Sequence, residues 1–291
     1  MPGVIVNYHP GLKADHNLLL ASQRPLDRRD YLAVAGASAV LLPQVCRPDL
    51  YALVAALNKP HFPRPLVHLC LDGKVGNHLL FQHLGLPSPR TLVFASLERA
   101  ARAWRRGEVS AAGLEPPLVA KGAGGGQGRN VFLVHGPEEL LSLEGSLDTH
   151  CFQGPKGLVL QERVAIPGRD ARVVVVGRQV DSFWRLVPEQ GAFFTSLSQG
   201  GIIDRQGWPE EMARAVALVR RLQDLAGLDM AGVDVLVPSD APPMLLEINF
   251  YFGRNAHGGT AGLRRVHLQA AREWLAGLGL DGERVGLDED E

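Results

Sequence analysis

Residues 117–131 read Pro-Leu-Val-Ala-Lys-Gly-Ala-Gly-Gly-Gly-Gln-Gly-Arg-Asn-Val, so an apolar strand delivers Lys121 into a glycine-rich loop and a second strand begins at Val131. Five glycines fall within the seven residues 122–128. Because glycine lacks a Cβ atom, such a loop can bring successive backbone N–H groups against phosphate oxygens. The Lys121 ammonium would add a point charge there. The stretch predicts a phosphate-binding loop, with a flexible hairpin loop as the alternative.

The same stretch argues against two other nucleotide-binding loops. The chain contains no GxxxxGK[ST] sequence, which a Walker loop requires, and the glycines of this loop do not satisfy GxGxxG at any register. A P-loop NTPase and a dinucleotide-binding domain are therefore disfavoured.

Acidic residues stand in two apolar strands more than a hundred residues later, predicted at residues 232–237 and 244–248. Because side chains alternate along a strand, Glu247 and Asn249 should project from the same face. Asp234, Glu247 and Asn249 together offer three oxygen ligands on an apolar sheet, which is typical of a Mg²⁺ site, with Mn²⁺ as the alternative ion. Surface carboxylates at strand ends are the other interpretation. The phosphate loop favours the metal site, because ATP chemistry needs both parts.

From residue 71 to residue 257 the chain resembles the RimK/glutathione-synthetase branch of the ATP-grasp superfamily. The matching pieces, in the family's order, are residues 73–74, 87–91, 119–128, 160–164, 168–172, 183–185, 200–201, 232–234 and 247–249. Each piece alone is weak or moderate as a signal. Their common order over most of the chain is specific.

The resemblance implies an α/β fold of ATP-grasp type. A small N-terminal α/β domain (1–65) would precede a small lobe with the glycine loop (66–165), a large lobe with the Mg²⁺ site (166–280) and an acidic tail (281–291). The proline-rich residues 59–65 mark the first boundary. Apolar patterns predict strands at residues 4–6, 39–42, 92–94, 118–121, 131–134, 158–161, 172–176, 179–184, 232–237 and 244–248. They predict helices at residues 49–57, 74–84, 97–106, 210–225 and 263–275.

The resemblance also implies roles for individual residues. The lysines and the loop would hold the ATP phosphates, a hinge would meet the adenine, and an aspartate would bind the ribose. In chain order these ATP-binding residues are Lys74, Lys121, Gly124, Gly125, Gly126, Gln127, Gly128, Glu162, Arg163, Val164 and Asp170. Arg172 and Arg185 would be the catalytic cations, because a fixed guanidinium stabilises charge that develops during acyl-phosphate chemistry. The alternative for both arginines is a salt bridge or a solvated hairpin.

Two departures from the family lie on the acceptor side. Ser196 stands where glutamate ligases have Asn, and Phe250 follows Asn249 where the family continues Ser-Pro-Gly. The resemblance therefore implies the ATP machinery without naming an acceptor. In residues 254–259, Arg254 is predicted to bind an anionic substrate group, with His257 in the same segment. An aromatic plug followed by an ordinary loop is the alternative.

The composition restricts the class of protein. The 30 Lys and Arg against 31 Asp and Glu give a formal net charge of -1, so neither nucleic acid nor a membrane is expected as a partner. Three scattered cysteines do not form a disulfide framework, and ten histidines give no HxxxH or HExxH pair for zinc. The start of the chain predicts a strand rather than a signal peptide, and a reducing cytoplasm is the expected location. His9, after the first strand, is a candidate for the cleft or an ordinary turn residue.

These features predict an ATP-dependent ligase that joins a carboxylate to an amine or thiol through an acyl-phosphate and releases ADP and Pi. The alternatives are an ATP-grasp kinase and a non-catalytic ATP-binding module, and the complete metal triad argues against the module. The substrate would be a small molecule or a peptide. A homodimer is the expected assembly on base rates alone.

Overall fold

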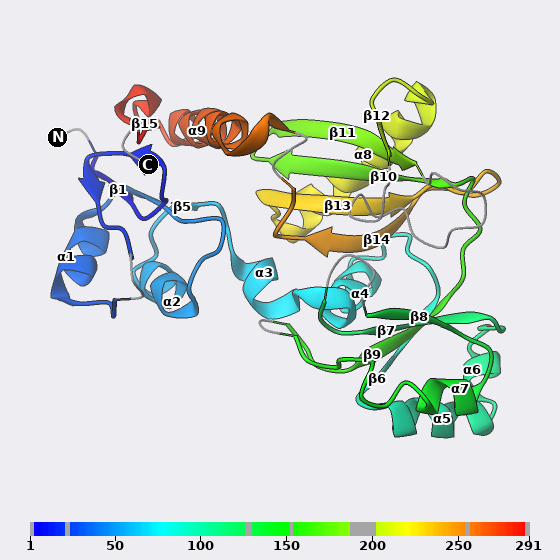
Figure 1. Cartoon of the computed structure of the whole chain (residues 1–291). Helices are drawn as coiled ribbons and strands as arrows, with labels where there is room; N and C mark the ends of the chain where they lie inside the picture. Colours follow the sequence, from blue (N-terminus) through cyan, green and yellow to red (C-terminus); the bar gives the residue numbers. More distant parts are fainter. Residues whose placement is uncertain are drawn as a thin grey trace.

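The computed structural model describes residues 3–20, 24–125, 130–151, 154–186, 202–253 and 257–288. The helices and sheets form three parts along the chain (Figure 1). The N-terminal part is a parallel sheet in the order β3-β1-β4-β5. It comprises β1 (Ile5–Asn7), β3 (His16–Asn17), β4 (Ala39–Leu41) and β5 (His61–Phe62), with helices α1 (Arg28–Gly36) and α2 (Pro48–Ala56).

The small lobe is an antiparallel sheet in the order β6-β9-β7-β8. Its elements are β6 (Thr91–Phe94), α5 (Leu97–Arg105), α6 (Glu108–Ala111), β7 (Leu118–Gly122), β8 (Val131–Val134), α7 (Pro137–Leu141) and β9 (Leu158–Glu162). Side chains alternate along the strands, so Leu118, Ala120 and Leu160 enter one core with the three helices. The residues between them, including Lys121 and Gln161, point to the opposite face.

The large lobe is an antiparallel sheet in the order β12-β11-β10-β13-β14. Its strands are β10 (Arg169–Val176), β11 (Gln179–Leu186), β12 (Ile202–Asp204), β13 (Met230–Leu236) and β14 (Met244–Asn249). Helix α8 (Pro209–Ala226) covers one face, where Val173 and Val233 pack with Val219 and Leu222. Helix α8 begins with proline and ends before Gly227, whose φ of 66° suits a glycine.

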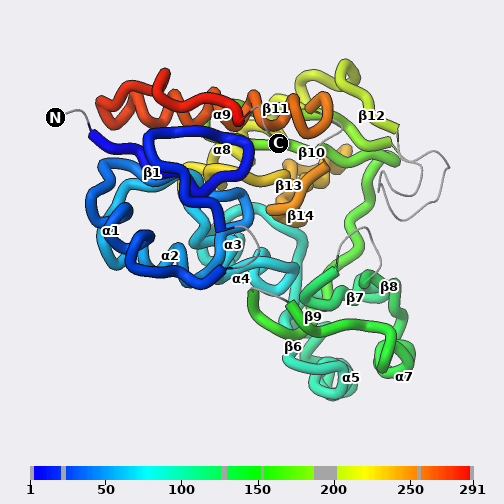
Figure 2. The backbone as a smooth tube through the Cα atoms, turned by 60° about the vertical axis from the view of Figure 1, so that its left-hand side comes forward, coloured from blue at the N-terminus to red at the C-terminus, as the bar shows by residue number. Residues whose placement is uncertain are grey.

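Helix α9 (Gly259–Gly277) joins the N-terminal part to the large lobe. Its Leu263 and Ala270 share one core with Val174 of β10 and Ile5 of β1, and it runs along both parts in Figure 2. Beyond it, the 3-10 helix η4 (Gly282–Arg284) leads to β15 (Gly286–Leu287), which pairs with β2 (Leu12–Lys13). The first and the last described residues therefore both lie on the N-terminal part.

Helices α3 (Leu66–Leu71) and α4 (Gly73–His83) lead from the N-terminal part to the two lobes. Only Asp72 separates them, and the φ of 77° at Gly73, the first residue of α4, allows the chain to turn directly from one helix to the next. Helix α4 packs against β14 of the large lobe and against β7 and β9 of the small lobe. It therefore sits where the two lobes meet.

The α/β class is confirmed, and each strand and helix predicted from apolar patterns is present, the strand at 131–134 with the predicted bounds and the others with ends shifted by up to four residues. Short elements were not predicted, among them α1, α3 and β12. Residues 61–62, inside the predicted proline-rich boundary, form β5 instead. The predicted acidic tail is folded as far as Asp288, which pairs with Lys13 at 2.8 Å, while residues 289–291 lie outside the described residues. The division at residues 65, 165 and 280 stays a prediction.

Candidate active site

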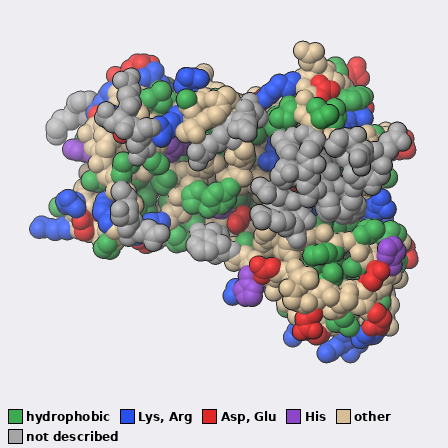
Figure 3. Space-filling view, in the orientation of Figure 1, with side chains coloured by type: hydrophobic (Ala, Val, Ile, Leu, Met, Phe, Trp, Pro, Cys, Tyr) green, Lys and Arg blue, Asp and Glu red, His purple; other side chains and the backbone are tan. Residues whose placement is uncertain are grey.

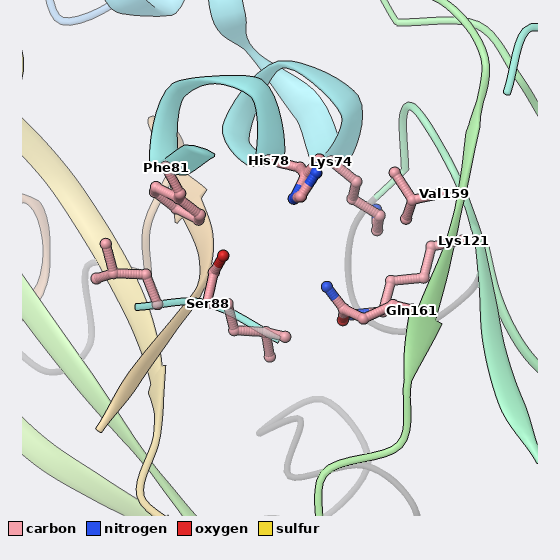
Figure 4. Close-up of a pocket in the computed structure, with 9 residues that line it drawn as sticks. Lys74, His78, Phe81, Ser88, Lys121, Val159 and Gln161 are labelled. Carbon is pink, nitrogen blue, oxygen red and sulfur yellow. The ribbon is translucent and has the colours of Figure 1, made fainter. Parts of the chain in front are cut away.

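A pocket lies between α4, the small lobe and β14 (Figure 4). Two lysines, further polar groups and apolar side chains line it: Lys74, His78, Phe81, Ser88, Lys121, Val159, Gln161, Leu245 and Leu246. The space between these side chains measures about 270 Å³, including the part that is open to solvent.

Lys74, in the first turn of α4, connects the glycine loop with the large lobe. Its backbone N–H donates to the carbonyl oxygen of Ala123 at 3.0 Å, which fixes the start of α4 on the loop. Its ammonium donates to the carbonyl oxygens of Gly124 at 3.2 Å and Gly125 at 2.8 Å. The same ammonium lies 3.9 Å from the Glu247 carboxylate. The buried Lys74 ammonium therefore contacts the predicted phosphate loop and also lies close to Glu247, a predicted metal ligand on β14.

The base of the glycine loop packs closely against residues 148–151. A Cβ atom at Gly122 would lie 2.0 Å from the Asp148 carbonyl oxygen, and one at Gly124 would lie 2.3 Å from that of His150. Asn130 ties the segments together, because its amide donates to the Asp148 carbonyl at 2.7 Å and accepts from the Asp148 N–H at 2.9 Å. Only glycine fits this approach. Outside the described residues lie three predicted phosphate ligands: Gly126, Gln127 and Gly128.

Lys121 extends from β7 into the same pocket (Figure 4). Its ammonium donates to Gln161 Oε1 at 2.5 Å. Burial lowers the pKa of Lys121 from 10.5 to about 8, and the positive charge of Lys74 acts in the same direction, while Glu247 and Asp234 oppose the shift. The Lys121 ammonium is therefore still mostly protonated at neutral pH.

Arginines and carboxylates form a network on one face of the large-lobe sheet. Arg172 lies opposite Asp234 in the β10–β13 ladder, with Arg172 Nε 2.5 Å from Asp234 Oδ1. Arg185 Nη2 is 3.0 Å from the same oxygen, and Arg185 Nε donates to Asp170 Oδ1 at 2.8 Å. The two predicted catalytic cations are thus held side by side by Asp234, which was predicted to be a metal ligand.

Arg185 is the most buried cation of this network. Burial disfavours its charged form, but the carboxylates of Asp234 and Asp170 more than offset this, so the pKa of Arg185 is raised above its usual value. Its charge is permanent at any physiological pH. Asp170 is only 2% exposed and accepts from Arg185. Its predicted contact with a ribose stays a prediction.

The predicted metal ligands come together on β13 and β14. Asp234 lies directly opposite Glu247, and Asn249 projects on the same side because Ile248 between them is buried. Asn249 Nδ2 donates to Asp234 Oδ2 at 3.2 Å. Among the described residues no three His, Cys, Asp or Glu side chains gather as a metal cluster. Two carboxylates and an amide are nevertheless the oxygen donors that suit Mg²⁺, so this set fits the ion.

Comparison with known proteins identifies the architecture. Residues 72–266 match the RimK-like ATP-grasp domain. The chain belongs to this ATP-grasp family. The crystal structure of a RimK domain protein ATP-grasp from Sphaerobacter thermophilus is similar, with a TM-score of 0.54, 17% identity and coverage of 92% of this chain and 98% of the other. The predicted ATP-grasp fold is thereby confirmed.

Two curated relatives are similar to part of this ATP-grasp chain. Human beta-citrylglutamate synthase B is 28% identical over 177 residues, which are 60% of this chain and 43% of that protein. A probable alpha-L-glutamate ligase from Klebsiella pneumoniae is 35% identical over 136 residues, 46% of this chain and 42% of that protein. The chain therefore matches less than half the length of either relative.

The predicted adenine hinge follows β9 of the ATP-grasp small lobe. Glu162 ends this strand, and its carboxylate accepts from the backbone N–H of Arg90 at 2.7 Å and from Arg90 Nε at 2.8 Å. Its own backbone N–H donates to the Arg90 carbonyl at 2.9 Å. Arg163 and Val164 come next, outside any strand. The Glu162 side chain is therefore engaged with the turn before β6.

The acceptor side is described only in part. Arg254 lies outside the described residues, as do residues 195–201. The His257 side chain is 5% exposed, and its Nδ1 is 3.4 Å from Asp181 of β11. Burial lowers the pKa of His257, Asp181 opposes this, and Arg205 adds to it. His257 is thus neutral at neutral pH, beside a carboxylate that the sequence analysis did not single out.

Two polar residues have contacts that the sequence did not predict. His9 is buried and packs edge-on against His267 of α9, with ring centroids 4.1 Å apart. Burial lowers the pKa of His9 to about 4, so it belongs to the contact between the N-terminal part and α9. Gln161 lies in residues 160–164, which resemble the family, but no role was assigned to it from the sequence. In the structure it contacts Lys121. Its period-two spacing from Val159 places both on the pocket face.

Charged side chains of both signs are mixed over the exposed end of the small lobe (Figure 3). This agrees with the near-zero formal net charge of -1. Among the described residues, no helix combines the length and apolar character that a membrane crossing requires.

Proposed function

We propose that this chain is an ATP-dependent ligase that joins a carboxylate to an amine, or to a thiol, and releases ADP and Pi. The single observation that supports this most is the position of Lys74, whose ammonium contacts the glycine loop and lies 3.9 Å from Glu247. The residues proposed to bind phosphates and those proposed to neutralise them are therefore close together between the two lobes.

In the proposed reaction a substrate carboxylate oxygen attacks the γ-phosphorus of ATP, and the bond from that phosphorus to ADP breaks. The amine nitrogen then attacks the carbonyl carbon of the acyl-phosphate, the bond to the phosphate oxygen breaks, and the nitrogen loses a proton. Lys74, Lys121 and the glycine loop would bind the phosphates. Arg172 and Arg185 would stabilise the charge that develops on the reacting oxygens.

Asp234, Glu247 and Asn249 would hold a Mg²⁺ ion, which when bound would neutralise phosphate oxygens. Asp234 is already fixed by Arg172 and Arg185, so its position would not depend on the ion. The backbone at Glu162, Arg163 and Val164 is proposed to meet the adenine, and Asp170 to bind the ribose. A cytoplasmic location and a homodimer stay predictions.

The acceptor is proposed to be an amino acid, with glutamate as the first to test, because both curated relatives carry glutamate in their names. The carboxylate would belong to a small molecule or a peptide. The sequence after Asn249 differs from that of the family, so the acceptor of the relatives cannot simply be assigned to this chain. Acceptor selection depends on the site rather than on the fold.

Product analysis tests the proposal. The protein is incubated with Mg²⁺-ATP, a panel of carboxylic acids and glutamate, and phosphate and amide products are measured. Stoichiometric Pi and amide support the ligase, whereas a phosphorylated acceptor without Pi shows the kinase. Binding of ATP without any turnover over the whole panel, or with ATP turnover that is independent of both substrates, counts against the ligase. Glu144→Gln, at an exposed position, and Glu247→Gln provide the matched pair of variants.

A further inference from the structure

A chain of hydrogen bonds runs through the small-lobe sheet and ends at the Lys121 ammonium. Lys121 Nζ donates to Gln161 Oε1 at 2.5 Å, and Gln161 Nε2 donates to Thr91 Oγ1 at 2.9 Å. The Thr91 hydroxyl donates in turn to the carbonyl oxygen of Pro89 at 2.8 Å. Gln161 is 7% exposed. These hydrogen bonds connect the Pro89 carbonyl oxygen with the Lys121 ammonium through the buried Gln161 and the half-buried Thr91.

The register of β6, β9 and β7 brings these hydrogen-bonding groups together. Gln161 of β9 lies directly opposite Thr91 of β6 and directly opposite Val119 of β7. Lys121 is two residues further along β7, so it is the diagonal neighbour of Gln161 on the same face. Gln161 is therefore held between two strands before any ligand arrives.

The main-chain carbonyl fixes the direction of every bond in the chain. A carbonyl oxygen can only accept, so the Thr91 hydroxyl must spend its one proton on Pro89. The hydroxyl then accepts from the Gln161 side chain, which must turn its NH₂ group toward Thr91. The amide oxygen is thereby directed at Lys121. A flipped amide would place an NH₂ group against an ammonium, with no acceptor between them.

A neutral acceptor has a consequence for charge. The amide oxygen fixes the position of the ammonium but leaves its positive charge uncompensated. A carboxylate at the same place would fix it equally well and would cancel that charge. Among the residues that the structure describes, the other charged or titratable groups that line the pocket or act on Lys121 are Lys74 and His78 of α4, Asp234 of β13 and Glu247 of β14.

We propose that Gln161 is a positioning residue that holds the Lys121 ammonium in the pocket through a neutral contact, so that its charge can bind a nucleotide phosphate, with Thr91 and Pro89 setting the orientation of the amide. This inference rests on the proposed function. The proposed function assigns Lys121 to the phosphates, and the inference adds how this lysine is oriented. Gln161, a neutral side chain, positions it, and Thr91 of the neighbouring strand sets the orientation of Gln161.

The first measurement follows Lys121 without any nucleotide. The chain has few lysines, so protein labelled with ¹³C at the lysine Cε can be titrated by NMR, with Lys121 assigned by its loss in Lys121→Arg. Gln161→Glu should raise the pKa of Lys121 by about one unit or more, because an opposite charge favours the ammonium. Gln161→Leu should lower it, since the ammonium loses its acceptor. Opposite shifts of this kind would not arise from a general disturbance of packing.

The second measurement is Mg²⁺-ATP binding by calorimetry on the same variants. Gln161→Glu should bind at least about tenfold more weakly than wild type, because it places a negative charge beside the phosphates. Gln82→Glu, the same change at an exposed position of α4, should bind like wild type. Thr91→Val should shift the Lys121 pKa in the direction of Gln161→Leu by a smaller amount, and Thr91→Ser should restore it.

The outcomes separate the two proposals. If the Lys121 titration is the same in wild type, Gln161→Glu and Gln161→Leu, the positioning role is overturned. It is also overturned if the titration moves while wild type and Gln161→Glu bind Mg²⁺-ATP equally. If wild type binds no Mg²⁺-ATP although the titrations shift as expected, the coupling of Gln161 to Lys121 stands and the proposed ATP-dependent function is overturned instead.

Discussion

The two lobes hold their cations in chemically different ways. In the small lobe and α4, the Lys121 and Lys74 ammonium groups donate their hydrogen bonds to neutral oxygens, those of the Gln161 amide and of the Gly124 and Gly125 carbonyls, and the Glu247 carboxylate lies further away, 3.9 Å from Lys74. In the large lobe, Arg172 and Arg185 are bound by carboxylates. Neutral acceptors leave a positive charge available for a phosphate, whereas carboxylates cancel much of it and fix geometry instead. The comparison predicts that the lysines attract the nucleotide and that the arginines mainly fix geometry.

The largest effect is expected from Asp234→Asn. The amide would leave Arg172 and Arg185 buried without their shared counter-charge, and breaking a buried ion pair in this way typically costs about 3–5 kcal/mol. Gln161→Leu removes only a neutral acceptor, so it should cost about 1–2 kcal/mol. Guanidinium unfolding followed by circular dichroism measures both. Equal losses would show that the two lobes do not differ as described.

Glu247→Gln should affect turnover rather than folding. It keeps the size and hydrogen bonding of the side chain but removes a charged metal ligand, and loss of even an indirect partner of a metal typically costs 10–100-fold. Turnover should therefore fall by at least about a hundredfold, with an unchanged unfolding midpoint. Initial rates of Pi release test this beside Glu144→Gln. Near-normal rates in Glu247→Gln would make β13 and β14 purely structural.

These assignments were partly accessible from sequence. The period-two pattern placed Glu247 and Asn249 on one face, and the glycines after Lys121 predicted a loop that backbone can approach closely. Both inferences use local geometry only. The pairing of Arg172 and Arg185 with Asp234 depends on the register of β10, β11 and β13, which no local pattern determines.

Long-range contacts account for the rest. Gln161 gains its role from Thr91, 70 residues earlier in the chain, and nothing in either segment alone shows that β6 and β9 are neighbours. His9 was a candidate for the cleft because it follows a strand. Its actual neighbour is His267 of α9, and the packing of that helix between two parts of the molecule could not be inferred from the sequence around His9.

Lys121→Ala should weaken Mg²⁺-ATP binding by about tenfold or more without unfolding the protein, because one uncompensated charge at the phosphates is lost. Lys156→Ala, which changes an exposed lysine outside the pocket, is the matched control. Calorimetry in the presence of Mg²⁺ measures both affinities. Equal affinity in wild type and Lys121→Ala would remove Lys121 from the site.

The pH dependence should separate the two kinds of cation. The pKa of Lys121 is lowered to about 8, so its ammonium is present below that pH and is lost as the pH rises through it, while the arginines stay charged. Affinity for Mg²⁺-ATP should therefore fall several-fold between pH 7 and pH 9. Lys121→Arg, which keeps its charge, should flatten the profile. A profile that is equally steep in both proteins would place the titrating group elsewhere.

The smallest effect is expected at His257, in the segment predicted to select the substrate. Its contact with Asp181 differs from those of both the lysines and the arginines. Asp181 is shared between Arg205, at 2.5 Å, and the buried ring of His257, at 3.4 Å, so a carboxylate here fixes a neutral side chain rather than a second cation. His257→Asn keeps a polar group but changes the shape of residues 254–259, the segment that follows β14. The KM for the acceptor or the carboxylate should rise several-fold, with the KM for ATP unchanged, and Arg254→Ala should act in the same direction. His135→Asn, on the exposed surface of the small lobe, should change neither constant. A rise confined to the KM for ATP would instead place His257 with the nucleotide-binding residues and would separate residues 254–259 from substrate selection.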